Sequence, residues 1–198
     1  DNPNNNDDDD DEENEPVEMV QDNTIIQKVL DSNPLLEAFG NAKTSRNHNS
    51  SRFGKYVKLR FEVKHPHTAP NCTLVGSSSE TFLLEKSRVT SHNATADERT
   101  FHIFYQLLAA PDNNKMTIWD GLVGKEPSSF RYIGESSTDE IEGLSDSQRW
   151  NRTLAALYLI GIKDDVFVSF MRTVCVVMQL GNLTFAGQDK AYIANKDE

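Results

Sequence analysis

The sequence predicts a mainly α-helical segment that carries one β-hairpin. Two observations indicate helices: apolar residues recur at helical spacing from Ile25 to Leu30, and longer apolar runs of the same kind recur over residues 97–180. A third indicates the hairpin, because apolar and polar residues alternate strictly over Tyr56–Val63. With 198 residues and 37% hydrophobic content, the chain can bury a core in one part without folding throughout.

The first predicted element is a pair of short helices in series. The helical spacing that begins at Ile25 ends at the capping residue Ser32. Pro34 suits the first turn of a second helix, and Gly40 marks its end. Residues 41–52 follow as a polar loop, because their Asn, Ser and Thr side chains compete for the hydrogen bonds of the backbone.

The hairpin begins with a strand over Tyr56–Val63, which we expect to be half buried because one of its faces is apolar. That face holds Val57, Leu59, Phe61 and Val63. A polar loop with Pro66, Pro70 and Cys72 then leads to a second short strand over Thr81–Glu85, which we expect to pair antiparallel with the first.

Three longer helices follow the hairpin. Helical spacing of apolar residues predicts them over Asp97–Ala110, Asp146–Ile160 and Asp164–Leu180. The last is apolar almost all round, which is typical of a helix inside a bundle. Cys175 lies within it and is expected to be a buried thiol, and His102 in the first of them is expected to be a hydrogen-bonded core or interface histidine.

The charge pattern separates an acidic N-terminal stretch from a nearly neutral remainder. The net charge is −11, but ten of the 31 acidic residues lie within residues 1–18, where no Lys or Arg occurs. We therefore expect residues 1–23 to be a disordered acidic surface loop or tail. The remainder lacks the clustered basic surface that binding to nucleic acid or to an anionic membrane requires.

Cysteine content and hydropathy exclude further classes of protein. Two cysteines cannot build a disulfide scaffold or a Cys-based zinc site. Charge-free stretches such as Thr153–Ile162 are well short of the roughly 20 residues that a membrane span needs, and no secretory signal is visible. The expectation is a soluble protein without a membrane span, in a reducing compartment.

Four ordered motifs carry a resemblance to a known family. They are Asn33–Thr44 (NPLLEAFGNAKT) with the loop that follows it, Leu83–Val89 (LLEKSRV), Glu98–Leu108 (ERTFHIFYQLL) and Leu180–Leu183 (LGNL). In order and spacing they resemble the myosin motor domain across about residues 24–186, and the loop resembles its nucleotide-sensing switch I. Within the second motif, Glu85–Arg88 is expected to be scaffolding at a strand end.

The resemblance implies an α/β parent fold, the P-loop NTPase fold of the myosin head, to which this mainly α-helical segment contributes a β-hairpin of the central sheet. The resemblance implies three divisions: a variable acidic surface loop or tail at 1–23, a partial motor domain at 24–186 and a truncated linker at 187–198. Within the partial motor domain it implies switch I at 41–55, two central-sheet strands at about 55–86 and the helical upper half of the actin-binding region at 94–186.

The resemblance also assigns roles within the loop. Asn47 and Ser50 would hydrogen-bond the nucleotide phosphates, and Ser51 would ligate Mg²⁺. Arg52, acting in catalysis with Ser50, would pair with a glutamate of a second switch loop and close the site behind the γ-phosphate of ATP. The residue types suit these roles, because a hydroxyl is a neutral, hard oxygen ligand for Mg²⁺ and an Asn amide donates to phosphate oxygens. His48 is given no role.

Two motifs that hydrolysis needs do not occur in the sequence: the phosphate loop Gly-x-x-x-x-Gly-Lys-Ser/Thr and the second switch Asp-x-x-Gly-Phe-Glu. We therefore expect an internal piece of an actin-based, ATP-driven motor that is inert as an ATPase alone, with ATP and Mg²⁺ as cofactors of the parent protein. Expected partners are the actin filament, largely through regions outside this chain, and the rest of the myosin heavy chain, in the cytoplasmic actin cytoskeleton. The alternative is a non-catalytic, myosin-like binding module that has lost the ATPase.

Overall fold

The computed structural model describes residues 23–64, 71–91 and 97–194. Its α-helices are α1 (Asn23–Asp31), α2 (Asn33–Gly40), α3 (Ser87–Thr90), α4 (His102–Leu108), α5 (Asp112–Ile118), α6 (Asp146–Leu159) and α7 (Asp164–Asn182), with short 3-10 helices at Asp120–Leu122 and Pro127–Ser129. Its strands pair antiparallel in twos: β1 (Asn41–Ala42) with β2 (Ser50–Ser51), β3 (Gly54–Lys64) with β4 (Asn71–Phe82), β5 (Glu140–Ile141) with β6 (Leu144–Ser145), and β7 (Phe185–Ala186) with β8 (Tyr192–Ile193). Apart from Asn23, the predicted acidic tail at residues 1–23 lies outside the described residues.

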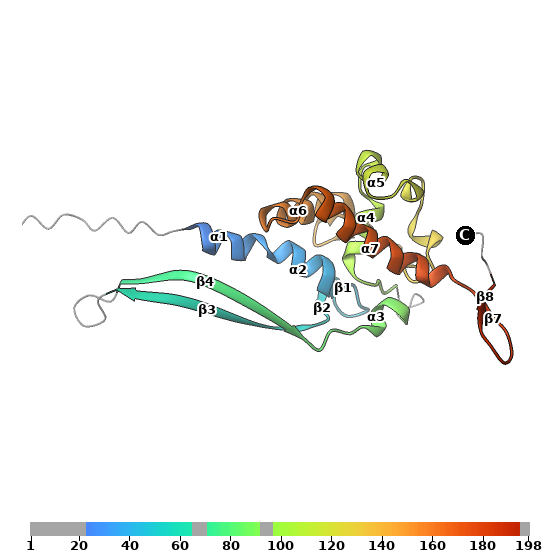
Figure 1. Cartoon of the computed structure of the whole chain (residues 1–198), viewed down its shortest axis with the longest axis horizontal. Helices are drawn as coiled ribbons and strands as arrows, with labels where there is room; N and C mark the ends of the chain where they lie inside the picture. Colours follow the sequence, from blue (N-terminus) through green and yellow to red (C-terminus); the bar gives the residue numbers. More distant parts are fainter. Residues whose placement is uncertain (1–22, 65–70, 92–96, 195–198) are drawn as a thin grey trace, which may run out of the picture.

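A block of helices and a long hairpin arm make up the described structure (Figure 1). The predicted pair of helices is confirmed, with Pro34 in the first turn of α2. α2 packs against α4 and α6, whereas α1 lies along β4. Gly40 ends α2 at a close approach of two segments, because a Cβ atom there would lie 2.1 Å from the ring of Phe53. The helix pair therefore joins the arm to the block.

One apolar core holds the helical block together. The fully buried apolar side chains of α4, α6 and α7 include Leu107, Trp150, Leu157, Met171 and Met178. The rings of Trp150 and Phe167 lie 6.3 Å apart in a tilted pair. Cys175, at 4% exposure, joins this core as the predicted buried thiol. Because each large apolar side chain contributes about 1.5–3 kcal/mol when fully buried, stability is concentrated here rather than in the arm.

The two C-terminal helices match their predicted ranges within a few residues. α6 begins at a capping box, in which the Ser145 hydroxyl accepts from the Gln148 amide and the Gln148 side chain accepts from the Ser145 amide. The prediction that α7 is enclosed on all sides is wrong, since Val166, Val176 and Leu180 are 51–61% exposed. α7 buries one face against the core and presents apolar residues on the other.

The helix predicted over Asp97–Ala110 is wrong for its first residues, because α4 begins only at His102. Asp97 has a left-handed φ of 53°, and the backbone amide of Arg99 donates to the carbonyl of Lys43 at 3.0 Å. A contact with a distant segment therefore overrides the local helical pattern at this point. The consequence is functional, because the non-helical segment supports the polar loop described below.

The hairpin β3–β4 is much longer than predicted. Its paired ends are Gly54 with Phe82 and Lys64 with Asn71, and the register shifts once, after Arg60. The loop predicted before Thr81 is wrong for residues 71–80, which belong to β4 and place Cys72 in a strand. The second strand predicted over Thr81–Glu85 ends at Phe82. Residues 71–80 include three Ser and show no apolar alternation, yet their backbone groups pair with those of β3 whatever the side chains are.

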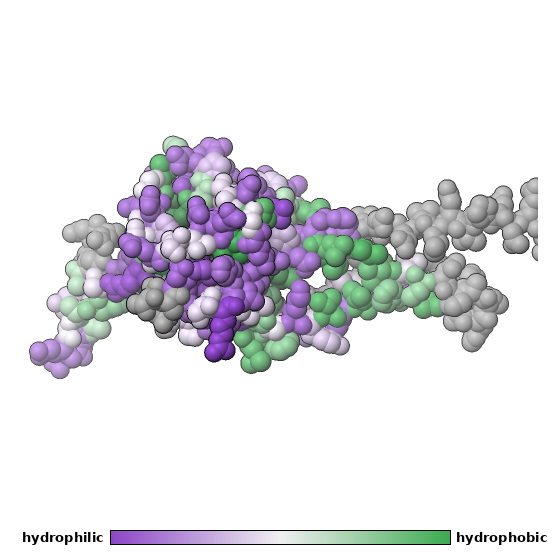
Figure 2. Space-filling model, turned by 180° about the vertical axis from the view of Figure 1, so that it is seen from behind, coloured by the Kyte–Doolittle hydropathy of each residue, from purple (hydrophilic) through white to green (hydrophobic). Residues whose placement is uncertain are grey.

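The apolar face of β3 is exposed, contrary to the prediction of a half-buried strand. Its exposed residues are Val57, Leu59, Phe61 and Val63, at 40–52%. Figure 2 shows hydrophobic surface along this arm, beyond the helical block. Within the described residues the two strands join no larger sheet. The alternating pattern predicted the strand correctly, but a two-stranded ribbon has little to pack against.

The segment predicted as a linker at residues 187–198 has structure in its described part. β8 pairs with β7, and the Ala194 amide donates to the Thr184 carbonyl at 2.8 Å. In the part of the chain that the structure describes, every helix is too short or too polar to cross a bilayer.

Candidate functional site

The loop predicted to bind phosphate and Mg²⁺ is closed at its base by the two-residue strands β1 and β2. Their pairing places Ser51 opposite Asn41, which directly follows α2, and Ser50 opposite Ala42. Asn47 lies in the connecting turn and is exposed, as is Ser51, whereas Ser50 is half-buried. The structure therefore brings the predicted ligand residues together on a loop with a fixed base.

Hydrogen bonds orient two of the predicted ligand groups. The Asn47 side-chain oxygen accepts from the Asn49 amide at 2.8 Å, and its Nδ2 donates to no acceptor within the described residues. The Ser51 hydroxyl donates to the Phe53 carbonyl at 3.0 Å, which leaves the lone pairs of its oxygen for a cation. An amide donor and a neutral oxygen ligand fit a phosphate and Mg²⁺ respectively, so the residues present suit the implied cofactors.

Arg52 is held by Glu85, at the open end of the hairpin. Its Nε lies 2.6 Å from Glu85 Oε2, and both side chains are about 30% exposed. Its Nη1 donates to Ser50 Oγ at 2.9 Å, so the Ser50 hydroxyl hydrogen can be given to another acceptor. The Nη2 of Arg52 makes no hydrogen bond within the described residues. The guanidinium is thus oriented on one side and open on the other.

Glu85 is shared between two arginines. Arg88 Nη2 lies 3.2 Å from Glu85 Oε1, and Arg88 Nη1 lies 2.9 Å from Glu98 Oε2. Burial raises the pKa of Glu85, but hydrogen bonds from Arg52 and Arg88 outweigh burial, so its pKa lies below the usual value. Glu85 therefore stays ionised and keeps Arg52 paired. The family resemblance implied a partner for Arg52 only in a second switch loop, and Glu85 was expected to be scaffolding; the structure places Glu85 against Arg52.

The first residues of the loop are fastened to the segment before α4. Lys43 Nζ contacts the Asp97 carboxylate and donates to the Asp97 carbonyl at 2.6 Å. The hydrogen bond from Lys43 lowers the pKa of Asp97 to about 2. The Ser45 amide donates to Glu98 Oε1 at 3.3 Å. These contacts explain why residues 97–101 are not helical.

Asn49 links the middle of the loop to the helical block. Its Oδ1 accepts from Asn41 Nδ2 at 3.0 Å and lies 3.1 Å from His102 Nε2. Its Nδ2 donates to Glu142 Oε2 at 2.9 Å, and Glu142 accepts in turn from Arg149 at 3.1 Å. These partners were not predictable from the sequence, because no local pattern relates Asn49 to residues that lie 53 and 93 positions away.

His102 is fully buried and neutral. Burial, followed by the positive charges of Arg99 and Arg149, lowers the pKa of His102 to about 3. Its Nδ1 has no hydrogen-bond partner among the described residues, so the predicted hydrogen bonding of this histidine is observed only at Nε2. Because Nε2 faces the Asn49 oxygen, we place the single ring proton on Nε2.

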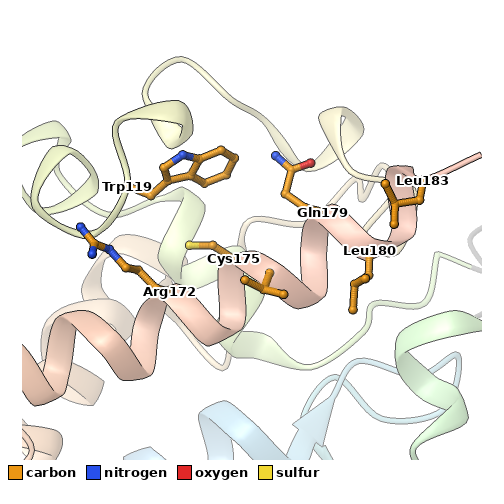
Figure 3. Close-up of a pocket in the computed structure, with 7 residues that line it drawn as sticks. Trp119, Arg172, Cys175, Gln179, Leu180 and Leu183 are labelled. Atoms are coloured by element: carbon orange, nitrogen blue, oxygen red, sulfur yellow. The ribbon is translucent and has the colours of Figure 1, made fainter. Parts of the chain in front are cut away.

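An apolar pocket lies elsewhere, between α7 and Trp119 (Figure 3). It encloses about 380 Å³ and is lined by Trp119, Arg172, Cys175, Val176, Gln179, Leu180 and Leu183. Arg172 is engaged through its Nε with the Ile118 carbonyl at 2.7 Å. Within residues 23–64, 71–91 and 97–194, no group of three or more His, Cys, Asp or Glu side chains could hold a metal ion. The polar loop therefore remains the better candidate for nucleotide and Mg²⁺.

Comparison with known proteins shows one family. The sequence profile described as myosin head (motor domain) matches residues 6–198. Myosin-15 of Arabidopsis thaliana is 41% identical over 166 residues, which is 83% of this chain and 10% of that protein. Protein OPAQUE1 of Zea mays is 39% identical over 171 residues, 86% and 10% of the two chains, and Myosin-52 of Schizosaccharomyces pombe is 34% identical over 182 residues, 91% and 11%. The chain spans about a tenth of the length of these relatives.

Proposed function

The chain belongs to the myosin head (motor domain) family, and we propose that it forms part of an actin-based, ATP-driven motor in which its loop at 41–55 senses the nucleotide phosphates and Mg²⁺. One observation carries the proposal: within six residues the loop offers the Nδ2 donor of the exposed Asn47, the hydroxyl oxygen of Ser51 with its lone pairs, and the ion-paired guanidinium of Arg52. The same proposal makes ATP and Mg²⁺ its cofactors, and the actin filament and the rest of a heavy chain its partners, in the cytoplasmic actin cytoskeleton.

Two side chains would bind the phosphates. Asn47 donates through Nδ2, because its oxygen is already occupied by the Asn49 amide. Ser50 donates through its hydroxyl, because its oxygen already accepts from Arg52. Both groups are neutral, so they orient a polyphosphate without balancing its charge.

Ser51 would provide one ligand of Mg²⁺, which neutralises phosphate charge when bound. Mg²⁺ usually keeps several waters and takes only a few protein ligands beside the phosphate oxygens, so one hydroxyl is a sufficient contribution from this loop. The bond from the Ser51 hydroxyl to the Phe53 carbonyl fixes the direction of its lone pairs. The loop would thus contact the metal and the phosphates through neighbouring residues.

Arg52 would close the site. Glu85 occupies its Nε and Ser50 one hydrogen of Nη1, so Nη2 can meet a second carboxylate without breaking the first pair. Such a closure costs little side-chain ordering, because Glu85 already holds the guanidinium in place. This is a positioning and water-excluding role, and we propose that the chain alone does not hydrolyse ATP.

Substitutions in a complete motor head that contains this segment test the assignment. Asn47→Ala should weaken ATP binding by about ten-fold or more, because a hydrogen bond to a charged acceptor is lost. Ser51→Ala should make the rate of ADP release insensitive to added Mg²⁺. His48→Ala, an exposed neighbour in the same loop, is the matched control and should change neither quantity.

The result also separates the motor from a binding module without ATPase. If Asn47→Ala and Ser51→Ala bind and release nucleotide as His48→Ala does, the assignment of this loop is wrong. Retained actin binding together with that result would favour the binding module.

A further inference from the structure

Asn49 lies between the proposed phosphate and Mg²⁺ ligands, yet its backbone amide and both polar atoms of its side chain are engaged by protein. Its amide donates to Asn47, and its side chain contacts Asn41, His102 and Glu142. We propose that Asn49 is a positioning residue that sets the place of the loop by anchoring it to the helical block. The proposal rests on the function proposed above and assigns Asn49 no contact with nucleotide.

The neighbours of Asn49 fix the orientation of its amide. Glu142 at 2.9 Å and Glu37 at 3.4 Å are carboxylates that can only accept, so Nδ2 must face them. Its oxygen then faces the donors of Asn41 and His102. A carboxylate at this position would be repelled by Glu142 and Glu37, and a serine has only one hydrogen to donate. The site therefore requires a side-chain amide.

The receiving side of the anchor is connected to the helical block through Arg149, although the Glu142 side chain itself is 59% exposed. Glu142 lies in the turn between β5 and β6 and is bound by Arg149, which also donates from Nε and Nη2 to the Ile141 carbonyl at 3.1 and 2.9 Å. Arg149 is 7% exposed and lies in α6 next to the fully buried Trp150. A group held by a packed helix positions its partner better than one held by another loop.

Loss of the anchor should act on both ligand residues that flank it. Asn47 is oriented by the Asn49 amide, and Ser50 follows Asn49 directly. Without the contact to Glu142 the loop would occupy other positions for part of the time. The apparent affinity of a ligand falls in proportion to the fraction of molecules in the binding-competent position. The expected effect is thus on nucleotide handling and not on the fold.

Hydrogen exchange of the 198-residue chain tests the anchor without nucleotide. Asn49→Ala should speed amide exchange at residues 44–51 by about ten-fold or more, because a hydrogen bond to a charged group is removed. Amides of α7 serve as the internal reference and should not change. Glu142→Gln changes the acceptor of the same contact, and it should produce a smaller increase in the exchange rate of the same amides. Unchanged exchange at residues 44–51 in both variants would overturn the anchor, and so would an equal increase in α7, which would indicate general destabilisation.

Kinetics of a complete motor head test the consequence. Asn49→Ala should lower the single-turnover rate of ATP hydrolysis by about ten-fold or more, with a melting temperature close to that of His48→Ala. Asn49→Asp should lower it further, because a carboxylate would face Glu142. Combining Asn49→Asp with Glu142→Gln should recover part of the rate, since the Gln amide can donate to the new carboxylate.

These outcomes separate two failures. If Asn47→Ala and Ser51→Ala alter nucleotide binding but Asn49→Ala matches His48→Ala, the anchor is wrong and the proposed function stands. If all of them match His48→Ala in kinetics while exchange at residues 44–51 still rises, the anchor exists but the loop does not serve nucleotide. A double variant as slow as Asn49→Asp alone would contradict the assigned pairing with Glu142.

Discussion

The buried ion pair of Arg99 and Asp146 should be the costliest polar contact to break. Arg99 Nη2 donates to both oxygens of Asp146 at 2.8 Å, and the two side chains are 0% and 8% exposed. The guanidinium also lies 3.6 Å from the ring centre of Tyr105. Because the Arg99 amide donates to the Lys43 carbonyl, the same residue supports the base of the candidate loop.

Replacement of Asp146 by Ala leaves the Arg99 charge buried and without its counter-ion. Breaking one side of a buried pair costs about 3–5 kcal/mol, against roughly 0–1 kcal/mol for an exposed pair. For a chain of this size about 1 kcal/mol corresponds to a shift of roughly 2–4 °C in melting temperature, so Asp146→Ala should lower it by about 6–20 °C. The double change Arg99→Met with Asp146→Leu should cost less, because no charge remains buried.

Urea unfolding of the 198-residue chain, followed by far-ultraviolet circular dichroism, measures the effect. The matched control is Glu80→Ala, which removes the exposed partner of Lys58, where the side chains are 49% and 64% exposed. We expect that control to stay within about 0.5 kcal/mol of the parent chain. If Asp146→Ala costs no more than Glu80→Ala, or if the double change costs more than Asp146→Ala, the reasoning about buried charge is refuted.

Three further predictions concern pH, local stability and activity. The pKa of His102 falls from its ordinary 6.5 to about 3, so only the unfolded chain takes up this proton between those values. Below pH 6.5 this protonation lowers the unfolding free energy of the parent chain by up to about 1.4 kcal/mol per pH unit, and His102→Gln should remove that contribution. If the unfolding free energy of both chains changes equally with pH, His102 is not a buried neutral histidine. Hydrogen exchange should be slow over residues 164–180 and fast over residues 56–63, and the reverse pattern would contradict a core within the helical block. The purified chain with actin should release no phosphate from ATP above a heat-treated control, because neither the phosphate loop nor the second switch occurs in its sequence.

Helices with long apolar patterns were predictable from the sequence, and their errors have tertiary causes. The helical spacing of apolar residues located α6 to within one residue. The start of α4 was misplaced because the segment from Asp97 is held by Lys43, a partner 54 residues away. The exposed face of α7 could not be predicted, because an apolar helix surface does not reveal whether anything covers it.

The hairpin shows the complementary limit. Alternation of apolar residues predicted β3, but it could not reveal the length of β4, whose Ser-rich sequence carries no such signal. The proximity of Arg52 and Glu85 depends on that pairing. Since Gly54 lies opposite Phe82, Arg52 before the first strand and Glu85 after the second must lie close together. A correct strand register would therefore have predicted the Glu85 contact from the sequence.

The candidate ligand residues Asn47, Ser50 and Ser51 lie within one short stretch of the sequence, and a family resemblance was enough to single them out. Their supports were not, because Glu85, His102 and Glu142 come from three separate elements. Such long-range polar contacts have no periodicity and no fixed spacing, so only the folded chain reveals them.

The positions of these supports decide how the loop could respond to a phosphate. It is fixed at its start by Lys43, in its middle by Asn49 and at its end by Arg52. The exposed Asn47 lies between the first two of these points, and the exposed Ser51 lies between the last two. A ligand shifts an equilibrium only through contacts that differ between the two states. On the proposed function, the contacts that differ between the two states would be concentrated at Arg52. Among the groups that hold the loop, only Nη2 of Arg52 has no acceptor in the described structure. A carboxylate that reaches Nη2 would therefore add contacts with little displacement of the backbone.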